Sequence, residues 1–519
     1  MKIFDTFRKN LDLILIFLIT FITASYFAGI GVDAHHDGAI LKPALDVANG
    51  RILFKETFTQ YGALFVFINS SLLLLFGKFL LTLRIATAFF YALIAVFIFL
   101  IYKKFLSKKI VYLTLLIWLL LAPYFWQVFF PWPSVYASFF LVVSIYLFLF
   151  SLKKEKQKII IENKHVFLTG IFSALSFWIK QPYLLVFFSI AFLFFLLFFL
   201  KTLSLKKAIN SIAVLSLGFL SASFVFIFYF ITTGSLKDWF LQSIRIGYIT
   251  GRIVGRGYDV FDLLKTLSLH PVWVILPFSC IFFFFYIYSL LKKNPDDLKK
   301  LSLLGVSLIC IFSFFQYFPI YDPSHIYWAI TPAVGLFAYV LFSFNLHKRV
   351  KNIKLYSLKQ NLLTVFFFGI ALITVFSIIS EVKLGINGVV EKNKKFNIKI
   401  VKPEILRGMR IDQKDAYFYS DVSQNISSYL EENQEKKFVV YDADALYAAF
   451  TNNQQNIDSF YVTNAGYTSG VYSYEKDFYI YVKNKKPLIF LHTDYLPFSK
   501  EYFVIKIWKE YKKALIAPI

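Results

Sequence analysis

Apolar runs of membrane-spanning length recur along most of this chain and leave little room for a water-soluble fold. Twelve such runs, each about 17 to 25 residues long, begin near Leu11, Tyr61, Ile85, Ile110, Pro131, Val166, Leu184, Ala208, Pro271, Leu301, Ile326 and Asn361. Hydrophobic residues make up 58% of the chain and include 65 Phe, which is more apolar surface than one soluble core can bury. The sequence therefore predicts an integral membrane protein whose membrane domain is all-α.

The lysines and arginines of the chain indicate its orientation in a membrane. The formal net charge is +24, but the basic residues gather in short connectors between apolar runs, so no nucleic-acid partner is expected. By the positive-inside rule, the clusters at 103–109, 153–164, 201–207, 292–300 and 347–354 are cytoplasmic. The segments that face outward are then 32–60, 126–134, 180–183, 233–270 and 317–326.

One apolar run in the first third of the chain is expected not to cross the membrane. Twelve full crossings would bring the C-terminus back to the side of the N-terminus, whereas the later lysine clusters place the C-terminal region outside. The connector with Lys78 and Arg84 and the connector at 103–109 cannot both be cytoplasmic if each run between them is a simple span. The ambiguity lies in residues 61–126, and roughly 11 to 13 helices are expected. The first run shows no trusted cleavage site and is expected to stay as an anchor.

A change of composition near residue 381 predicts two domains. Residues 1–380 form the polytopic membrane domain, and residues 381–519, richer in Asp, Asn, Gln, Tyr and Lys, form a small extracytoplasmic α/β domain. Its expected elements are a helix over 421–435 and strands over 438–441, 478–482, 487–491 and 502–508. This domain has no glycine-rich phosphate loop, metal-ligand spacing or nucleophile elbow, so the chemistry is expected in the membrane domain.

The polar segment after the first apolar run is the strongest chemical signal. Its opening, Asp33-Ala34-His35-His36-Asp37, places two acids and two histidines beside a membrane helix. Ionisable side chains in this position cost free energy, and proteins usually retain them for a chemical function. Leu41, Leu45 and Ala48 then share one helical face, which predicts a short interfacial helix that ends at Gly50. Asp37 at headgroup depth can act as a general base, with Asp33 as the second choice. The alternative is a solvated turn in which Asp37 caps the helix.

Other polar residues near this segment carry weaker signals. His35 and His36 suit a metal or a phosphate, or are plain surface residues. No cofactor is expected, although a divalent ion is chemically compatible with these histidines and the aspartates. Tyr61, in Gln60-Tyr61-Gly62, and the triplet Trp132-Pro133-Ser134 stand where spans meet the outer side, and either line a sugar pocket with His36 or belong to an aromatic belt.

Several of these motifs together resemble a known family. They are Asp37-Gly38, Ala44, Gly50, the Phe54-x-x-Thr57-Phe58-x-x-Tyr61-Gly62 stretch, Phe76-Gly77 and Arg84. The chain is similar here to the opening of the GT-C glycosyltransferases, particularly the family 39-like group that includes protein O-mannosyltransferases and aminoarabinose transferases. The resemblance implies transfer of a sugar from a polyprenyl phosphate on the extracytoplasmic side, with an acidic motif in the first outer loop. The family's acids are usually adjacent or one apart, and here Asp33 and Asp37 are four apart.

The resemblance also extends to later cationic positions. Lys180 and Gln181, at the end of an apolar run, look like the family's lysine that faces the donor phosphate. A lysine on the outer side runs against the positive-inside bias, so either a phosphate compensates it or it snorkels to the interface. His325, at a predicted helix start in a loop similar to one of the family's, can donate to a phosphate oxygen. Asp322 in the same loop either contacts substrate or forms a turn.

The outer loop after residue 233 supplies three arginines among aromatic residues. Arg245, Arg252 and Arg256 can clamp a phosphate through two N–H groups each, or can anchor the loop in the interface. Together with the acidic segment and the resemblance to the GT-C glycosyltransferases, they predict a multi-pass glycosyltransferase of the bacterial cytoplasmic membrane that uses a polyprenyl-phosphate-linked sugar. The acceptor is a lipid, a glycan or a protein. The alternatives are a transporter or flippase of lipid-linked or anionic solutes, and a polysaccharide polymerase or ligase.

Overall fold

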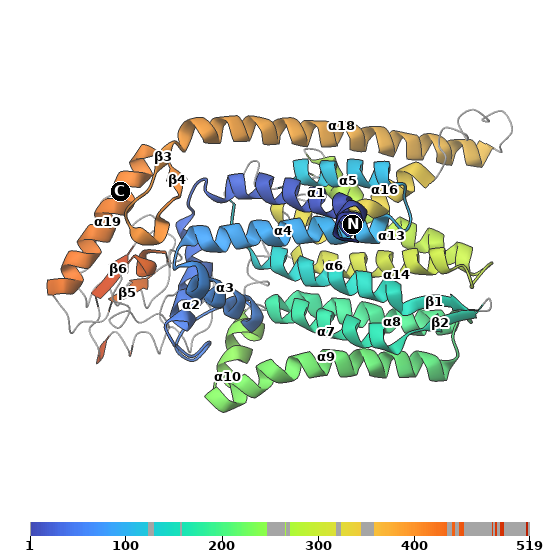
Figure 1. Cartoon of the computed structure of the whole chain (residues 1–519), viewed down its shortest axis with the longest axis horizontal. Helices are drawn as coiled ribbons and strands as arrows, with labels where there is room; N and C mark the ends of the chain where they lie inside the picture. Colours follow the sequence, from blue (N-terminus) through green and yellow to red (C-terminus); the bar gives the residue numbers. More distant parts are fainter. Residues whose placement is uncertain are drawn as a thin grey trace.

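The computed structural model describes residues 2–122, 129–155, 158–246, 265, 270–317, 323–343, 358–432, 438–441, 446–450, 480, 483–484, 488–491 and 515–516. Within this part of the chain, helices run side by side in one bundle and a small mixed domain lies at one end (Figure 1). The helices of the bundle are α1 (Lys2–Ala28), α4 (Leu80–Tyr102), α5 (Lys108–Leu120), α6 (Pro133–Ser151), α7 (Asn163–Ile179), α8 (Leu184–Phe199), α9 (Leu205–Thr233), α13 (Pro271–Leu291), α14 (Leu298–Ser313), α15 (Pro323–Ile330), α16 (Val334–Ser343) and α18 (Leu358–Lys395).

Eight helices in the described residues are long and apolar enough to cross a membrane, from Asn10–Ala28 at the start to Leu372–Lys395 at the end. The chain is therefore a multi-pass membrane protein, as predicted. Phe and Leu side chains on the outer faces of these helices stay exposed, for example Phe224 and Phe376, because lipid and not protein is their partner. The interior is closed by buried aromatic and aliphatic residues that form one large core and a smaller cluster with Phe54, Trp178 and Phe230.

The helix α3 (Ala63–Phe76) resolves the ambiguity over residues 61–126. It has 14 residues, begins beside the end of α7, where the Gly62 N–H donates to the Ile179 carbonyl at 3.0 Å, and leads directly into α4. Both of its ends lie at the end of the bundle that carries α2 (Ala34–Ala48), so α3 does not cross (Figure 1). Lys78 therefore lies on the side of the first loop, where its Nζ donates to the Asn49 side chain.

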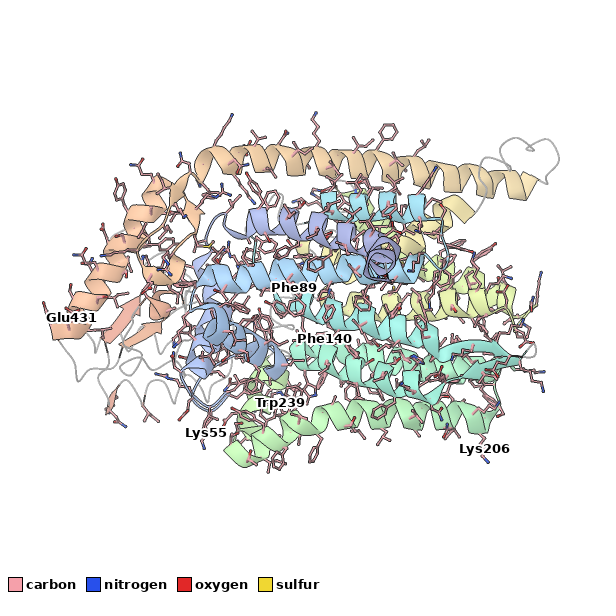
Figure 2. The ribbon with its side chains drawn as sticks, viewed as in Figure 1. Lys55, Phe89, Phe140, Lys206, Trp239 and Glu431 are labelled. Carbon is pink, nitrogen blue, oxygen red and sulfur yellow. The ribbon has the colours of Figure 1, made fainter. Side chains whose placement is uncertain are left out.

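The two ends of the bundle differ in charge as the sequence predicts. The hairpin of β1 (Leu152–Glu155) and β2 (Lys158–Ile161), antiparallel with Leu152 opposite Ile161, closes the basic end. Lys206 lies at that end and Lys55 at the opposite end, with the first loop (Figure 2). The acidic loop lies at the end opposite the hairpin (Figure 1). The start of α6 and α15 lie beside it, because the Trp132 ring contacts the rings of His36 and His325, and η2 (Gln181–Tyr183) contacts the same loop at Gln60.

The helix α18 crosses residue 380, where the sequence predicts the domain boundary. The helix α18 continues without a break through Glu381 to Lys395, and Glu381 is buried where His270 Nδ1 lies 2.6 Å from its Oε1. The Ser377 hydroxyl accepts a hydrogen bond from the Val272 N–H in the same contact. The change in composition reflects the end of α18 that leaves the bundle, so the small domain begins after Lys395.

The small domain has the predicted α/β character. After β3 (Ile398–Lys399), η7 (Glu404–Leu406) and β4 (Arg410–Ile411), α19 (Gln413–Glu432) leads to β5 (Phe438–Tyr441), η8 (Tyr447–Ala449), β6 (Leu488–Leu491) and β7 (Leu515–Ile516). The strands β5, β6 and β7 pair in parallel, with Phe438 opposite Leu488. The strands expected near 438–441 and 487–491 are confirmed. The helix starts earlier than predicted, because Asp412 and not Asp421 accepts the N–H bond that opens it. The strand predicted at 502–508 lies outside the described residues, as does that at 478–482 except for Ile480.

Candidate active site

The acidic segment folds as the predicted short helix, but its cap is Asp33. Asp33 has an extended backbone, and its Oδ1 accepts the His36 N–H at 2.8 Å, which satisfies one of the free donors at the start of α2. Leu41 and Leu45 are fully buried on the inner face. The helix ends at Ala48, and Gly50 adopts a φ of +87° that glycine takes without strain. The capping role considered for Asp37 therefore belongs to Asp33.

Asp37 does not fit the role of general base that the sequence suggested. Its side chain is completely buried and receives two hydrogen bonds from Arg84, which is also completely buried. Its Oδ2 accepts in addition the Asp33 N–H at 2.9 Å. A carboxylate held this way between two guanidinium N–H groups and a backbone amide cannot approach an acceptor hydroxyl. Asp37 therefore holds the start of α2, and these contacts favour Asp33 over Asp37 as the candidate base.

Asp33 is the acid that stays accessible. About 30% of its side chain is exposed, and its Oδ2 lies 3.0 Å from Nδ1 of His36, whose side chain is 35% exposed. Burial raises the pKa of Asp33, but the hydrogen bonds and charge of His36, with a contribution from His35, outweigh that effect and lower the pKa to about 2. Asp33 and His36 thus form a carboxylate–imidazole pair at the end of the bundle that carries α2.

A buried tryptophan brings the predicted site residues together. The ring of Trp132, just before α6, lies 5.3 Å from His36, 5.7 Å from Tyr61 and 5.9 Å from His325, centroid to centroid. It also stacks on Trp328 at 5.8 Å. Three segments far apart in the sequence therefore meet at one point. The triplet Trp132-Pro133-Ser134 had given only a weak signal, because nothing in a single sequence shows which belt tryptophan becomes a centre of packing.

Lys180 belongs to the same region and is held in a polar pocket. Its Nζ donates to Ser134 Oγ at 2.7 Å, to the Gln316 carbonyl at 3.3 Å and to Gln316 Oε1 at 3.4 Å. All of these acceptors are neutral. Gln181 does not face the same atoms, because its Nε2 donates to the Gln60 carbonyl at 3.1 Å.

Two further N–H donors near Lys180 have no protein acceptor in the described part of the chain. They are Trp132 Nε1 and Gln316 Nε2, both buried. Each such donor costs about 1–3 kcal/mol unless something accepts from it. A cation and two unsatisfied N–H groups in one neighbourhood are the donor set that an anion such as a phosphate requires. Gln316 was missed from the sequence, although a glutamine at the end of an apolar run was an available signal.

Gly62 allows Lys180 to reach this position. It ends the first outer loop and lies against the end of α7, where a Cβ built on Gly62 would stand 2.0 Å from the Trp178 carbonyl oxygen. Trp178 is itself buried and donates from Nε1 to Ser223 Oγ at 2.9 Å, so this backbone cannot easily move. The glycine of the Gln60-Tyr61-Gly62 motif therefore permits a backbone contact two residues before Lys180.

We expect Gly62→Ala to lower the free energy of unfolding by about 2 kcal/mol or more, because the added methyl meets rigid backbone. The measurement is thermal unfolding of the purified protein in detergent. Gly369→Ala is the matched control, because a Cβ there meets no atom within 4 Å and the site lies within α18. Equal melting temperatures for the two variants would show that the contact at Gly62 is easily relieved.

The segment that follows α9 holds the first loop in place through residues the sequence did not single out. Gln242, in η3 (Phe240–Ile246), donates from Nε2 to the Phe54 carbonyl at 2.7 Å and accepts the Thr59 N–H at 3.2 Å. Ser243 donates to the Tyr61 carbonyl at 3.1 Å. Arg245 follows and is exposed. Arg252, Arg256 and Asp322 lie outside the described residues.

In the described residues no three His, Cys, Asp or Glu side chains gather as a metal site. Both acids of the first loop already have protein partners, since Asp33 pairs with His36 and Asp37 with Arg84. Cys280 and Cys310 are free and buried.

Comparison with known proteins gives structural similarities only. No family model and no curated protein matches the sequence. Among solved structures, the chain is similar to the Archaeoglobus fulgidus oligosaccharyltransferase tethered to an acceptor peptide with the NVT sequon, with a TM-score of 0.47 and 13% identity over 88% of this chain and 64% of that one. It is also similar to AglB of that organism in complex with an inhibitory peptide and a dolichol-phosphate, with a TM-score of 0.45 and 12% identity over 89% of this chain and 65% of that one.

A third similar structure is that of ArnT from Cupriavidus metallidurans in the apo state. The TM-score is 0.45 and the identity 12%, over 94% of each chain. The chain thus spans 64% of the length of the first oligosaccharyltransferase structure and 94% of that of ArnT. No site residue and no activity is transferred from these similarities.

Proposed function

We propose that this protein is a membrane glycosyltransferase that moves a sugar from a polyprenyl-phosphate donor to an acceptor on the extracytoplasmic face. The observation that carries the proposal is the meeting, around Trp132, of the accessible Asp33–His36 pair with the Lys180 ammonium and two buried N–H donors that lack an acceptor in the described residues. A base and an anion site at one end of a lipid-facing bundle are the two parts that displacement of a lipid phosphate requires. The basic hairpin end then faces the bacterial cytoplasm, and the small domain lies outside.

The roles follow from the contacts. Asp33, held by His36, takes the proton of the acceptor nucleophile, which attacks the anomeric carbon of the donor sugar. Lys180, with Gln316 and Trp132, stabilises the charge that grows on the departing phosphate. His325, whose ring contacts that of Trp132, donates a further hydrogen bond to the phosphate. In this proposal Arg245, Arg252 and Arg256, from the loop after residue 233, also bind the phosphate. Tyr61, His36 and Asp322 contact the sugar. No cofactor takes part in this proposal.

The proposal is tested with a radiolabelled polyprenyl-phosphate sugar and purified protein in liposomes, followed by chemical analysis of the products. Transfer of label to an acceptor, with release of polyprenyl phosphate, is the expected result. Label that stays on the lipid but crosses the bilayer would instead identify a transporter or flippase. Label in a lengthening glycan chain would identify a polymerase.

We expect Lys180→Gln to lower kcat/KM by about 10²- to 10³-fold, because a charge on the leaving phosphate loses its cation. The shorter amide keeps a donor for Ser134, so the loss reports charge more than packing. Lys206→Gln, at the opposite end of the bundle, is the control and should leave kcat/KM unchanged (Figure 2). Comparable activity of the two variants would place the phosphate elsewhere.

The pH dependence of transfer tests the pairing of Asp33 with His36. Because His36 lowers the pKa of Asp33 while burial raises it, His36→Gln is expected to raise that pKa. The acid limb of kcat/KM, which depends on ionised Asp33, should then move to higher pH by on the order of one unit. His165→Gln serves as control, because His165 lies on α7 at the hairpin end. An unchanged acid limb in the His36 variant would argue against Asp33 as the base.

A further inference from the structure

The small domain shares its core with the membrane domain and is not a separate body on a linker. Buried residues of β4, η7 and α19, among them Leu406, Met409 and Ile411, belong to the same continuous hydrophobic cluster as the helices of the bundle. The segment η8 packs against α2, the helix that begins at the acidic pair. In Figure 1 this domain lies at the end of the bundle that carries α2.

The tightest link between the domains runs through the backbone just before the acidic segment. The Arg410 N–H donates to the Gly29 carbonyl at 2.7 Å, and the Gly31 N–H donates to the Arg410 carbonyl at 2.8 Å, so Ile30 and Arg410 form a parallel bridge. The Arg410 guanidinium lies over the Tyr26 ring at 5.3 Å. Nearby, the Arg407 guanidinium lies over the Phe79 ring at 4.4 Å.

The membrane domain also contacts this segment, through Arg84 of α4. Arg84 Nη1 donates to the carbonyls of Ile30 at 3.3 Å and Gly31 at 2.9 Å, while its remaining N–H groups hold Asp37. Between them, Arg84 and Arg410 satisfy the Gly29, Ile30 and Gly31 carbonyls and the Gly31 N–H. The Ile30 N–H donates back to the Phe27 carbonyl at 3.1 Å and Gly31 has a φ of +70°, so the chain leaves α1 through a turn whose carbonyls are satisfied by these partners from other segments. Asp33 follows two residues later.

We propose that the small domain is a positioning element of the active site, in which the backbone of Arg410 fixes the 29–31 segment and so sets the place of Asp33. This inference rests on the proposed function for its consequence in catalysis, but the positioning itself is measurable without transfer. The proposal makes the small domain a structural part of the active site. Tyr419 in α19 is close enough to this segment to sense its charges. Burial raises the pKa of Tyr419, and the negative charges of Asp37 and Asp33 in the membrane domain raise it further.

The test compares two changes at one position. Arg410→Pro removes the N–H that donates to Gly29, whereas Arg410→Ala keeps it and removes only the side-chain contacts. The Arg410 N–H donates to Gly29 and not to β3, and the neighbouring bonds of Ile400 with Met409 and Gly408 use neither of the groups that are changed. We expect backbone amide exchange in residues 29–36 to become about tenfold faster in the proline variant and to stay near the parent rate in the alanine variant. With an active enzyme, kcat should fall more than KM rises in the proline variant alone.

Equal exchange rates in the two variants would overturn the proposal, whether or not the protein transfers sugar. A second measurement covers the case in which the proline variant does not fold. Ile30→Cys and Arg410→Cys are combined with Cys280→Ala and Cys310→Ala, and a disulfide is formed across the bridge. If the domain positions the segment without moving, the oxidised protein should keep both the slow amide exchange of residues 29–36 and its turnover. Turnover that is lost on oxidation and restored by reduction would show instead that the domain must leave the loop.

Discussion

Asp33→Asn is expected to lower kcat by about 10²- to 10⁴-fold, the range that removal of a general base produces. Asparagine is as good a helix cap as aspartate, so its side-chain oxygen can still accept the His36 N–H and α2 should form as before. The amide cannot take a proton, and the loss therefore reports chemistry more than folding. The measurement is single-turnover transfer from a labelled polyprenyl-phosphate sugar.

The control for this variant is Asp12→Asn. Asp12 lies in α1 near its basic end, in an exposed ion pair with Lys108 at 2.5 Å, and its replacement should change neither kcat nor KM. Near-parent activity of Asp33→Asn in a folded protein would remove Asp33 from the mechanism. Binding of the donor should survive the change, because the cation and N–H donors around Lys180 are left intact.

Asp37→Asn is expected to act on stability, with a loss of about 3–5 kcal/mol, because it leaves the Arg84 charge buried and unpaired. Both side chains are completely buried, so water cannot compensate. The measurement is the free energy of unfolding in a mild detergent with added denaturant. Asp12→Asn again gives the comparison, since an exposed pair contributes about 1 kcal/mol or less.

The kinetics of the Asp37 variant separate the two acids. Material that folds at low temperature should keep kcat within about tenfold of the parent, because Asp37 has no access to the substrate and acts through the placement of Asp33. A folded Asp37→Asn protein with unchanged stability and no transfer would return the catalytic role to Asp37. Loss of stability with retained turnover would confirm that Asp37 and Arg84 together hold the start of α2.

The membrane architecture could be predicted because it depends on local composition. Each of the twelve apolar runs corresponds to a helix, or to the pair α15 and α16, since a bilayer requires every spanning backbone to bond within its own segment. Lysine placement gave the two ends of the bundle. The small domain could be recognised from its composition. The residue at which it begins is harder to read from the sequence, because α18 carries polar residues for several turns before it ends at Lys395.

The site was predicted in part. Asp33, His36, Tyr61, Lys180 and His325 were named from the sequence, and they lie at one end of the bundle. The sequence favours Asp37 over Asp33 as the base, but a sequence does not show that Arg84, 47 residues after Asp37, donates to it. Gln316 and Gln242 were missed for the same reason, since their importance lies in which groups they face.

Sequence alone determined that this chain is a multi-helix membrane protein with an acidic first loop and basic connectors, because hydrophobic length and charge placement act residue by residue. Only the tertiary structure decided which carboxylate is accessible, that Trp132 is the meeting point of three segments, and that the small domain holds the acidic loop. These features depend on burial and on hydrogen bonds between distant segments, and the free energy of a charge or a donor is set by its neighbours in space.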